Sequence, residues 1–397
     1  MKTFASASLD VEINQAGIKV ESNNSEGALR YAPIHWMKWV LILILIKLSL
    51  VIIGLASCAF FNQQFAPTQF SWLAPWYRWD VIEFYTVTIN GYEPGTPLAH
   101  LIVKFPIVPL MIRGIGFLGI HNLFLAGFIM ATLVSLPIPI LMEKLARLDY
   151  GEDISERSAW FLLIFPMSFC LHLPLTEGIF MVLALNAFLA ARKNDWKQAA
   201  ITAALAGATR VNGILLIPAL VAEAAYQYSV ERKWCSGWMW LALAPLGTII
   251  YCGLCFWLFG DVFAYMKFQP EYAGQHVTWP WIGITNLIHH ALTTSSIDRF
   301  VYIYPECVAL VFLMVITVWT CFKYRPSYSI WTALNLLLCI STTSILSLPR
   351  YAIVIFPIYL FLAELTKLRI VYAATSCVLI GFFVYFSVLF AAGWSAF

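Results

Sequence analysis

The chain has 397 residues, of which 61% are hydrophobic and only 11% are charged. An ordinary soluble domain has roughly 25% charged residues, so this composition indicates an all-α protein that crosses the membrane several times. The net charge of +3 is small and the basic residues are scattered, which excludes nucleic acid as a partner.

The N-terminal part of the chain changes from polar to apolar near residue 39. Residues 1–38 contain no apolar core of signal-peptide type, so they are predicted to be a retained, loosely ordered cytoplasmic tail. The first membrane span is expected at Trp39–Phe61, followed by a long loop at 62–121. Within this loop, Phe105–Ile120 is apolar but contains two prolines and Arg113, and it is short for a span of about 20 residues. It is therefore predicted to lie at the membrane surface.

The domain 39–397 is predicted to be a bundle of about eleven transmembrane helices, because ten further apolar segments follow the first. With the N-terminus in the cytoplasm, most lysines and arginines fall in cytoplasmic segments, as the positive-inside rule requires. The loops 62–121 and 260–300 then lie on the extracytoplasmic face, where we expect the chemistry to take place. The ten segments are Asn122–Met142, Ser158–Leu173, Leu175–Ala191, Gln198–Thr209, Asn212–Ser229, Trp238–Phe259, Val301–Phe322, Tyr328–Leu346, Tyr351–Leu365 and Ile370–Ala392.

Some of these segments are too short to cross the bilayer completely. A helix at Gln198–Thr209 would cover only about 18 Å of a hydrocarbon core of about 30 Å. Arg210 is therefore expected below the extracytoplasmic surface, and so is the turn that contains Glu177. Ionised groups at that depth are tolerated where they line a cavity, which predicts that these turns form the floor of an outward-facing crevice.

Asp80 is the first candidate for a reactive group. This carboxylate follows Trp76 and Trp79 in a partly apolar loop, where its pKa can be adjusted for general-base catalysis. Glu83 would share one face of a helix with Asp80. The alternative is an ordinary acid at a helix start beside tryptophans that anchor the loop at the interface. A divalent cation could bridge the pair, but no third ligand is near in the sequence; neither a metal site nor another cofactor is supported.

Arg210 and Arg350 are candidates for binding an anionic headgroup, because a guanidinium can hold a phosphate with two hydrogen bonds. The alternative is that they pair with Glu177 or reach lipid phosphates. In the second long loop, Gln269 and Trp281 belong to clusters of polar and aromatic residues of the kind that bind sugars. Anchoring at the membrane interface explains the tryptophans equally well.

Five short motifs along most of the chain resemble those of the GT-C superfamily of glycosyltransferases, and within it the GPI mannosyltransferase II (PIG-V-like) family. They are Arg78-Trp79-Asp80 with Phe84-Tyr85 and Gly91-Tyr92; Phe105-Pro106 with Pro109-Leu110 and Arg113; Thr176-Glu177 with Phe180; Thr209-Arg210 with Asn212-Gly213; and Arg350-Tyr351. The sequence departs from the family pattern at three positions, where Val211 stands for a proline, Gly178 for a serine and Val108 for a tyrosine. These departures put the fine specificity in doubt.

The resemblance implies a GT-C-like bundle that performs an inverting transfer of mannose from a dolichyl- or undecaprenyl-type phosphate to an acceptor hydroxyl. Asp80 would deprotonate the acceptor, and Glu83 is assigned a catalytic role beside it. The donor phosphate would be held by Arg210, Arg350 and Lys104. The remaining substrate contacts are assigned to Trp79, Glu177, Asn212, Tyr351, Gln269 and Trp281.

Two other functions are compatible with the same composition. A transporter or flippase for a lipid-linked or anionic substrate would also place charged groups within the membrane. Against it, the sequence has no internal repeat with broken helices in both halves. A membrane acyltransferase would need a cluster such as His-Asp, which does not stand out. The expected partners are therefore a polyprenyl-phosphate-sugar donor, membrane lipids, and a glycan, glycolipid or protein acceptor, in a bacterial plasma membrane rather than the endoplasmic reticulum.

Overall fold

The computed structural model of this protein describes residues 35–61, 70–294 and 299–394. Within these ranges the chain forms helices and no strand, apart from one isolated bridge between Val277 and Thr342. The predicted tail 1–38 lies outside the described residues except for its last four, and helix α1 already begins at Trp36.

The helices of the first half are α1 (Trp36–Phe60), η1 (Ala74–Trp76), α2 (Asp80–Asn90), η2 (Ala99–Val103), α3 (Ile107–Phe117), α4 (Leu123–Ser135), α5 (Pro137–Ala146), α6 (Glu152–Ile164), η3 (Ser168–His172), α7 (Thr176–Arg192) and α8 (Trp196–Gly207). Those of the second half are η4 (Val211–Leu215), α9 (Leu216–Glu231), η5 (Ser236–Leu243), α10 (Leu246–Phe259), α11 (Ala264–Ala273), α12 (Pro280–Thr293), η6 (Arg299–Ile303), α14 (Tyr304–Lys323), α15 (Pro326–Ile340), α16 (Leu348–Ala352), α17 (Pro357–Leu365) and α18 (Arg369–Ala391).

Six helical stretches of the described residues are long and apolar enough to cross a membrane. The all-helical, membrane-spanning fold predicted from composition is thus confirmed, whereas the number of eleven spans is not. The six stretches are Trp36–Phe60, Leu123–Ala146, Val211–Glu231, Ser236–Phe259, Arg299–Lys323 and Arg369–Ala391.

The other predicted spans contain shorter helices, and prolines account for two of the interruptions. Helix α6 ends at Ile164 because the next residue precedes Pro166, and a residue before a proline disfavours the α conformation. The last predicted span but one is divided into α16 and α17, and α17 begins at Pro357. Proline is tolerated in a first helical turn, where its missing N–H would have had no partner within the helix.

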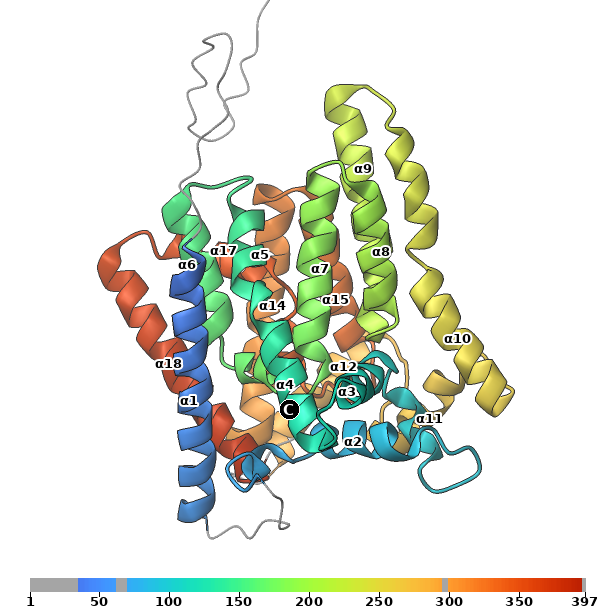
Figure 1. Cartoon of the computed structure of the whole chain (residues 1–397). Coiled ribbons are helices and arrows are strands. Elements are labelled where there is room, and N and C mark those ends of the chain that lie inside the picture. The colour runs from blue at the N-terminus through green and yellow to red at the C-terminus, as the bar shows by residue number, and fades with distance from the viewer. Residues whose placement is uncertain (1–34, 62–69, 295–298, 395–397) are drawn as a thin grey trace, which may run out of the picture. The chain divides into compact units, whose positions relative to one another are not determined.

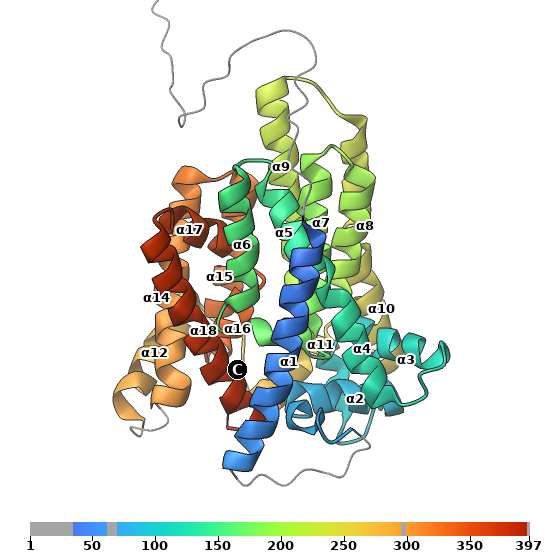
Figure 2. The same ribbon diagram turned by 60° about the vertical axis from the view of Figure 1, so that its left-hand side comes forward.

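Helix α7 lies inside the bundle, and most of its side chains are buried. It contacts α4, α5, α8 and α9 (Figure 1), while α1 packs beside α18 (Figure 2). Helix α8 is rich in alanine and lies close to α10: a Cβ added to Gly247 would come within 1.7 Å of the Ala204 carbonyl oxygen. Small residues let two helices approach in this way.

The helices α2, α3, α11 and α12 gather at one end of the long helices, which we call the loop end (Figures 1 and 2). Helix α2 lies across the ends of the long helices and packs against α3. Both α2 and α3 come from the first long loop of the sequence, and α11 and α12 come from the second. The two loops therefore meet at this end of the bundle.

Candidate active site

A cavity of about 600 Å³ opens at the loop end, within the usual size range for a small-molecule site. Its walls come from α2, η2, α11, α12, α14, α16 and the turn after α8. Nine of the eleven residues selected from the sequence line it: Trp79, Asp80, Glu83, Lys104, Arg210, Asn212, Gln269, Arg350 and Tyr351. The other two, Glu177 and Trp281, do not.

Helix α2 carries the two acids on its cavity side. Asp80 is its first residue, and the preceding Trp79 has a positive φ of 49°. The opposite face is apolar and buried, and the Tyr85 hydroxyl donates to the Phe124 carbonyl at 2.6 Å, which fixes α2 to α4. The spacing of three residues leaves Asp80 and Glu83 on the same side of the helix, where both lie within hydrogen-bond distance of one hydroxyl.

That hydroxyl belongs to Tyr272 on α11, which the sequence analysis did not select although it noted the neighbouring Gln269. It donates to Asp80 Oδ1 at 2.7 Å or to Glu83 Oε2 at 2.8 Å. Burial and the two carboxylates raise the pKa of Tyr272, so the phenol stays protonated as the donor. Tyr272 belongs to the Gln269-Pro270-Glu271-Tyr272 cluster that was singled out for sugar binding. Its contact with the two acids follows from the packing of α11 against η2.

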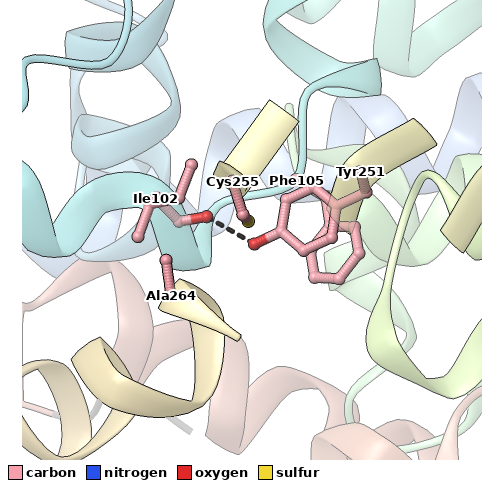
Figure 3. Packing of buried hydrophobic residues seen from close by; sticks show 5 residues of the cluster. All are labelled: Ile102, Phe105, Tyr251, Cys255 and Ala264. Carbon is pink, nitrogen blue, oxygen red and sulfur yellow. Dashed lines mark hydrogen bonds between the residues drawn. The ribbon is translucent and has the colours of Figure 1, made fainter. Parts of the chain in front are cut away.

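Lys104 contacts Asp80, Glu83 and Tyr272, and we call these four residues the Lys104 group. Its ammonium lies 2.6 Å from Asp80 Oδ1, 2.7 Å from Glu83 Oε2 and 2.7 Å from the Tyr272 hydroxyl. The segment that carries Lys104 is held by a buried apolar cluster shown in Figure 3. There the Tyr251 hydroxyl donates to the Ile102 carbonyl at 2.7 Å, and the Tyr251 ring stacks on Phe105 with 3.9 Å between centroids. The residues before and after Lys104 are thus fixed to α10.

Arg350 connects this group to a second set of charges. Its Nη1 lies 2.6 Å from Asp80 Oδ2, and its Nε lies 2.5 Å from Glu177 Oε1. The same Glu177 oxygen is 2.5 Å from Arg210 Nη1. Glu177 is completely buried behind the two arginines, so it orients them and is not exposed to the cavity. The Arg210 guanidinium also lies over the Tyr351 ring, 5.1 Å from its centroid.

A close backbone approach sets the position of Arg210. A Cβ added to Gly213, three residues later, would come within 2.4 Å of the Ala206 carbonyl group. Only glycine therefore lets the turn after Arg210 fold back against the end of α8. In that turn Asn212 faces the cavity and donates to Asn335 on α15 at 2.7 Å. This buried amide pair links the turn to the bundle.

The ion pairs join three cations, Lys104, Arg210 and Arg350, to three carboxylates, Asp80, Glu83 and Glu177. Burial alone would raise the pKa of Asp80, but the charges of Lys104 and Arg350 outweigh it and hold this pKa well below its usual range. The carboxylate is therefore ionised at neutral pH. The equal number of opposite charges makes this network neutral as a whole.

Trp281 lies outside the cavity. It is the second residue of α12, is 59% exposed, and stacks on Trp279 with ring centroids 5.0 Å apart. On the same helix His290 does line the cavity. Within the described ranges, no group of three or more His, Cys, Asp and Glu residues is arranged to hold a metal ion.

The described residues form an all-helical membrane bundle, with loop helices at one end that enclose a charged cavity. Among solved structures, the chain is similar to ArnT from Cupriavidus metallidurans bound to undecaprenyl phosphate, with a TM-score of 0.50 and 16% sequence identity. The match covers 86% of this chain and 62% of that one, so the chain spans less than two thirds of the length of ArnT. No family model and no curated protein matches the sequence.

Proposed function

We propose that this protein is a membrane glycosyltransferase that transfers a sugar from a polyprenyl-phosphate donor to an acceptor hydroxyl. The observation that carries the proposal is the position of Asp80 at the cavity wall, 2.6 Å from both Lys104 and Arg350. A base for the acceptor and cations for the leaving phosphate are the two elements this reaction needs. The fold agrees with it, because ArnT, which is similar in fold, binds undecaprenyl phosphate.

Because the charge network is already neutral, a phosphate can bind only by replacing existing contacts between cations and carboxylates. A donor phosphodiester adds a negative charge to a group in which each cation already has a carboxylate partner. The phosphate must therefore compete with Asp80 and Glu177 for the cations. Arg350, which contacts both carboxylates, is the residue through which that exchange would proceed. Lys104 and Arg210, on either side, would complete the phosphate site.

The same exchange would prepare Asp80 for its role. With Lys104 and Arg350 bound to it, the carboxylate has a low pKa and is a weak base. Once the phosphate shares those cations, the pKa of Asp80 would rise toward the range of a useful base. Asp80 would then take the proton of the acceptor hydroxyl as its oxygen attacks the anomeric carbon. The bond from that carbon to the phosphate oxygen breaks with inversion, and the phosphate leaves with the electron pair.

The other cavity residues would bind the sugar and the acceptor. Trp79 and Tyr351 offer aromatic faces, while Asn212 and Gln269 offer amides. Glu83 would keep Lys104 and Tyr272 in place beside the catalytic carboxylate. The resemblance to the PIG-V-like family favours mannose as the sugar and a glycan, glycolipid or protein as the acceptor. The reaction would take place at the extracytoplasmic face of a bacterial plasma membrane.

The test is a transfer assay with the purified protein in proteoliposomes, synthetic polyprenyl-phosphate-mannose and a panel of hydroxyl acceptors. Asp80→Asn should fold and bind the donor but lose transfer by a factor of at least about 10². Glu93→Gln is the control, since this acid lies in the same loop but does not line the cavity. Full transfer by Asp80→Asn would exclude Asp80 as the base. Uptake of the lipid without transfer, in the native protein, would identify a transporter instead.

A further inference from the structure

The backbone around Arg350 has an unusual conformation. Ser347, the residue before α16, has a φ of +63°, in the left-handed region that residues with a side chain rarely adopt. Four non-glycine residues among those described have a positive φ. Two of them precede the partners of the Asp80–Arg350 ion pair: Trp79 by one residue and Ser347 by three. Strain of this kind persists where surrounding contacts hold it, and it gathers at functional sites.

The contact that holds the turn at Ser347 comes from Glu306. One oxygen of this side chain accepts the Ser347 N–H at 2.7 Å, and the other accepts the Leu348 N–H at 2.9 Å. Glu306 is only 3% exposed and lies in the first turn of α14, and it also lines the cavity. The sequence analysis placed it inside an apolar span and gave it no role.

We propose that Glu306 is a positioning residue, which holds the Ser347 turn so that Arg350 can bridge Asp80 and the donor phosphate. The inference rests on the proposed function, because it assigns Arg350 to the phosphate. Two buried carboxyl groups then fix Arg350 from two directions. Glu177 on α7 holds the guanidinium, and Glu306 on α14 holds the backbone three residues earlier.

This arrangement affects donor binding, because a flexible arginine would bind the phosphate less tightly than a fixed one. An exposed or mobile guanidinium must give up side-chain freedom when it binds an anion, which weakens binding. A guanidinium that is already fixed does not have that cost. Holding the backbone at Ser347 also determines the direction in which α16 leaves the turn, and therefore the height of Arg350 in the cavity wall.

Glu306→Gln is the sharpest substitution for a test. Glutamine has nearly the same shape, but only one oxygen accepts, and its NH₂ group would face a backbone N–H. One of the two hydrogen bonds is lost, and two donors are brought together. We expect donor binding to weaken roughly tenfold, seen as a higher KM for polyprenyl-phosphate-mannose, with a smaller change in kcat at saturating donor.

A double-mutant cycle separates positioning from mere stability. If Glu306 acts through Arg350, then Glu306→Gln should weaken donor binding little further in a chain that already carries Arg350→Ala. A purely structural role predicts that the two losses add. Glu143→Gln is the matched control, since Glu143 is equally buried but binds Trp39 and Arg147 far from the cavity. This control should lower thermal stability without changing donor KM.

Ser347→Gly provides a second measurement that does not depend on the glutamine variant alone. Glycine adopts a φ of +63° without strain, so Ser347→Gly should restore part of the donor affinity lost in Glu306→Gln. Additive losses in the cycle, or no rescue by glycine, would overturn the role of Glu306 while the native protein still transfers sugar. A native protein that neither binds nor transfers from polyprenyl-phosphate-mannose would overturn the proposed function itself, and the inference with it.

Discussion

Asp80 and Arg350 are separated by 270 residues in the sequence, yet Oδ2 of the first lies 2.6 Å from Nη1 of the second. This ion pair joins α2, in the first long loop, to α16. It also connects the Lys104 group to the buried pair of Glu177 with Arg210. A change in either residue should therefore affect both halves of the site.

Arg350→Ala should weaken the binding of a polyprenyl-phosphate donor at least roughly tenfold, because truncating one partner of a buried, hydrogen-bonded charge pair costs about 2–5 kcal/mol. Arg350→Lys should recover little, since one ammonium cannot reproduce the fixed fork that meets both Asp80 and Glu177. The measurement is donor affinity in proteoliposomes. Lys267→Ala, which removes an exposed cation from α11, is the control and should leave affinity unchanged. Equal losses in both variants would indicate a nonspecific charge effect.

Glu177→Gln should destabilise the protein by about 3–5 kcal/mol, because it leaves Arg210 and Arg350 buried without their shared counter-charge. Thermal unfolding in detergent would measure the loss. Glu156→Gln is the comparison: it breaks an exposed pair with Lys38, and such pairs contribute only about 0–1 kcal/mol. If the two substitutions lowered the melting temperature equally, Glu177 would not be the central ion of a buried network.

Much of the bundle could be predicted from the sequence, because long apolar runs such as the one in α1 have few alternatives to a membrane helix. Short runs were harder: Pro166 and Pro357 interrupt segments whose composition alone predicts a span. Arg210 and Arg350 could be selected from the sequence as candidate site residues, because a charged residue between two apolar segments is easy to recognise. That the arginines share Glu177 was expected only as an alternative to a role in phosphate binding.

The contacts of two important residues could not be predicted from the sequence, for different reasons. Tyr272 stood in a cluster expected to bind sugar, but it meets Asp80 only because α11 packs near α2, although the two residues are 192 positions apart in the sequence. Glu306 could be seen as an acid in an apolar span, but its partners are backbone N–H groups, which carry no sequence signal. Trp281 was selected for its residue type, but it is exposed and does not line the cavity. Long-range packing decides all three cases.

Tyr272→Phe should lower kcat by about tenfold while leaving the fold intact, because it removes one hydroxyl that bonds Asp80, Glu83 and Lys104 together. The ring remains and can still lie under the Lys104 ammonium, 4.4 Å from its centroid. Steady-state transfer rates with saturating donor would measure the change. Tyr228→Phe, at an exposed position of α9, should behave like the native protein. An unchanged kcat in Tyr272→Phe would remove the hydroxyl from the catalytic arrangement.

The pH dependence of stability tests the low pKa of Asp80 directly. Lys104 and Arg350 hold this pKa below the value of about 3.9 that applies to an unfolded aspartate, even though burial opposes them. A depressed folded pKa contributes stability that is present above the unfolded pKa and is lost as the pH falls through the folded one. The difference in melting temperature between the native protein and Asp80→Asn should therefore stay constant from about pH 8 to about pH 5. The difference should change only below about pH 4, where the native protein loses the stability that its ionised Asp80 carboxylate contributes. A difference that varied near neutral pH would mean that Asp80 titrates there, and that the two cations do not hold it ionised.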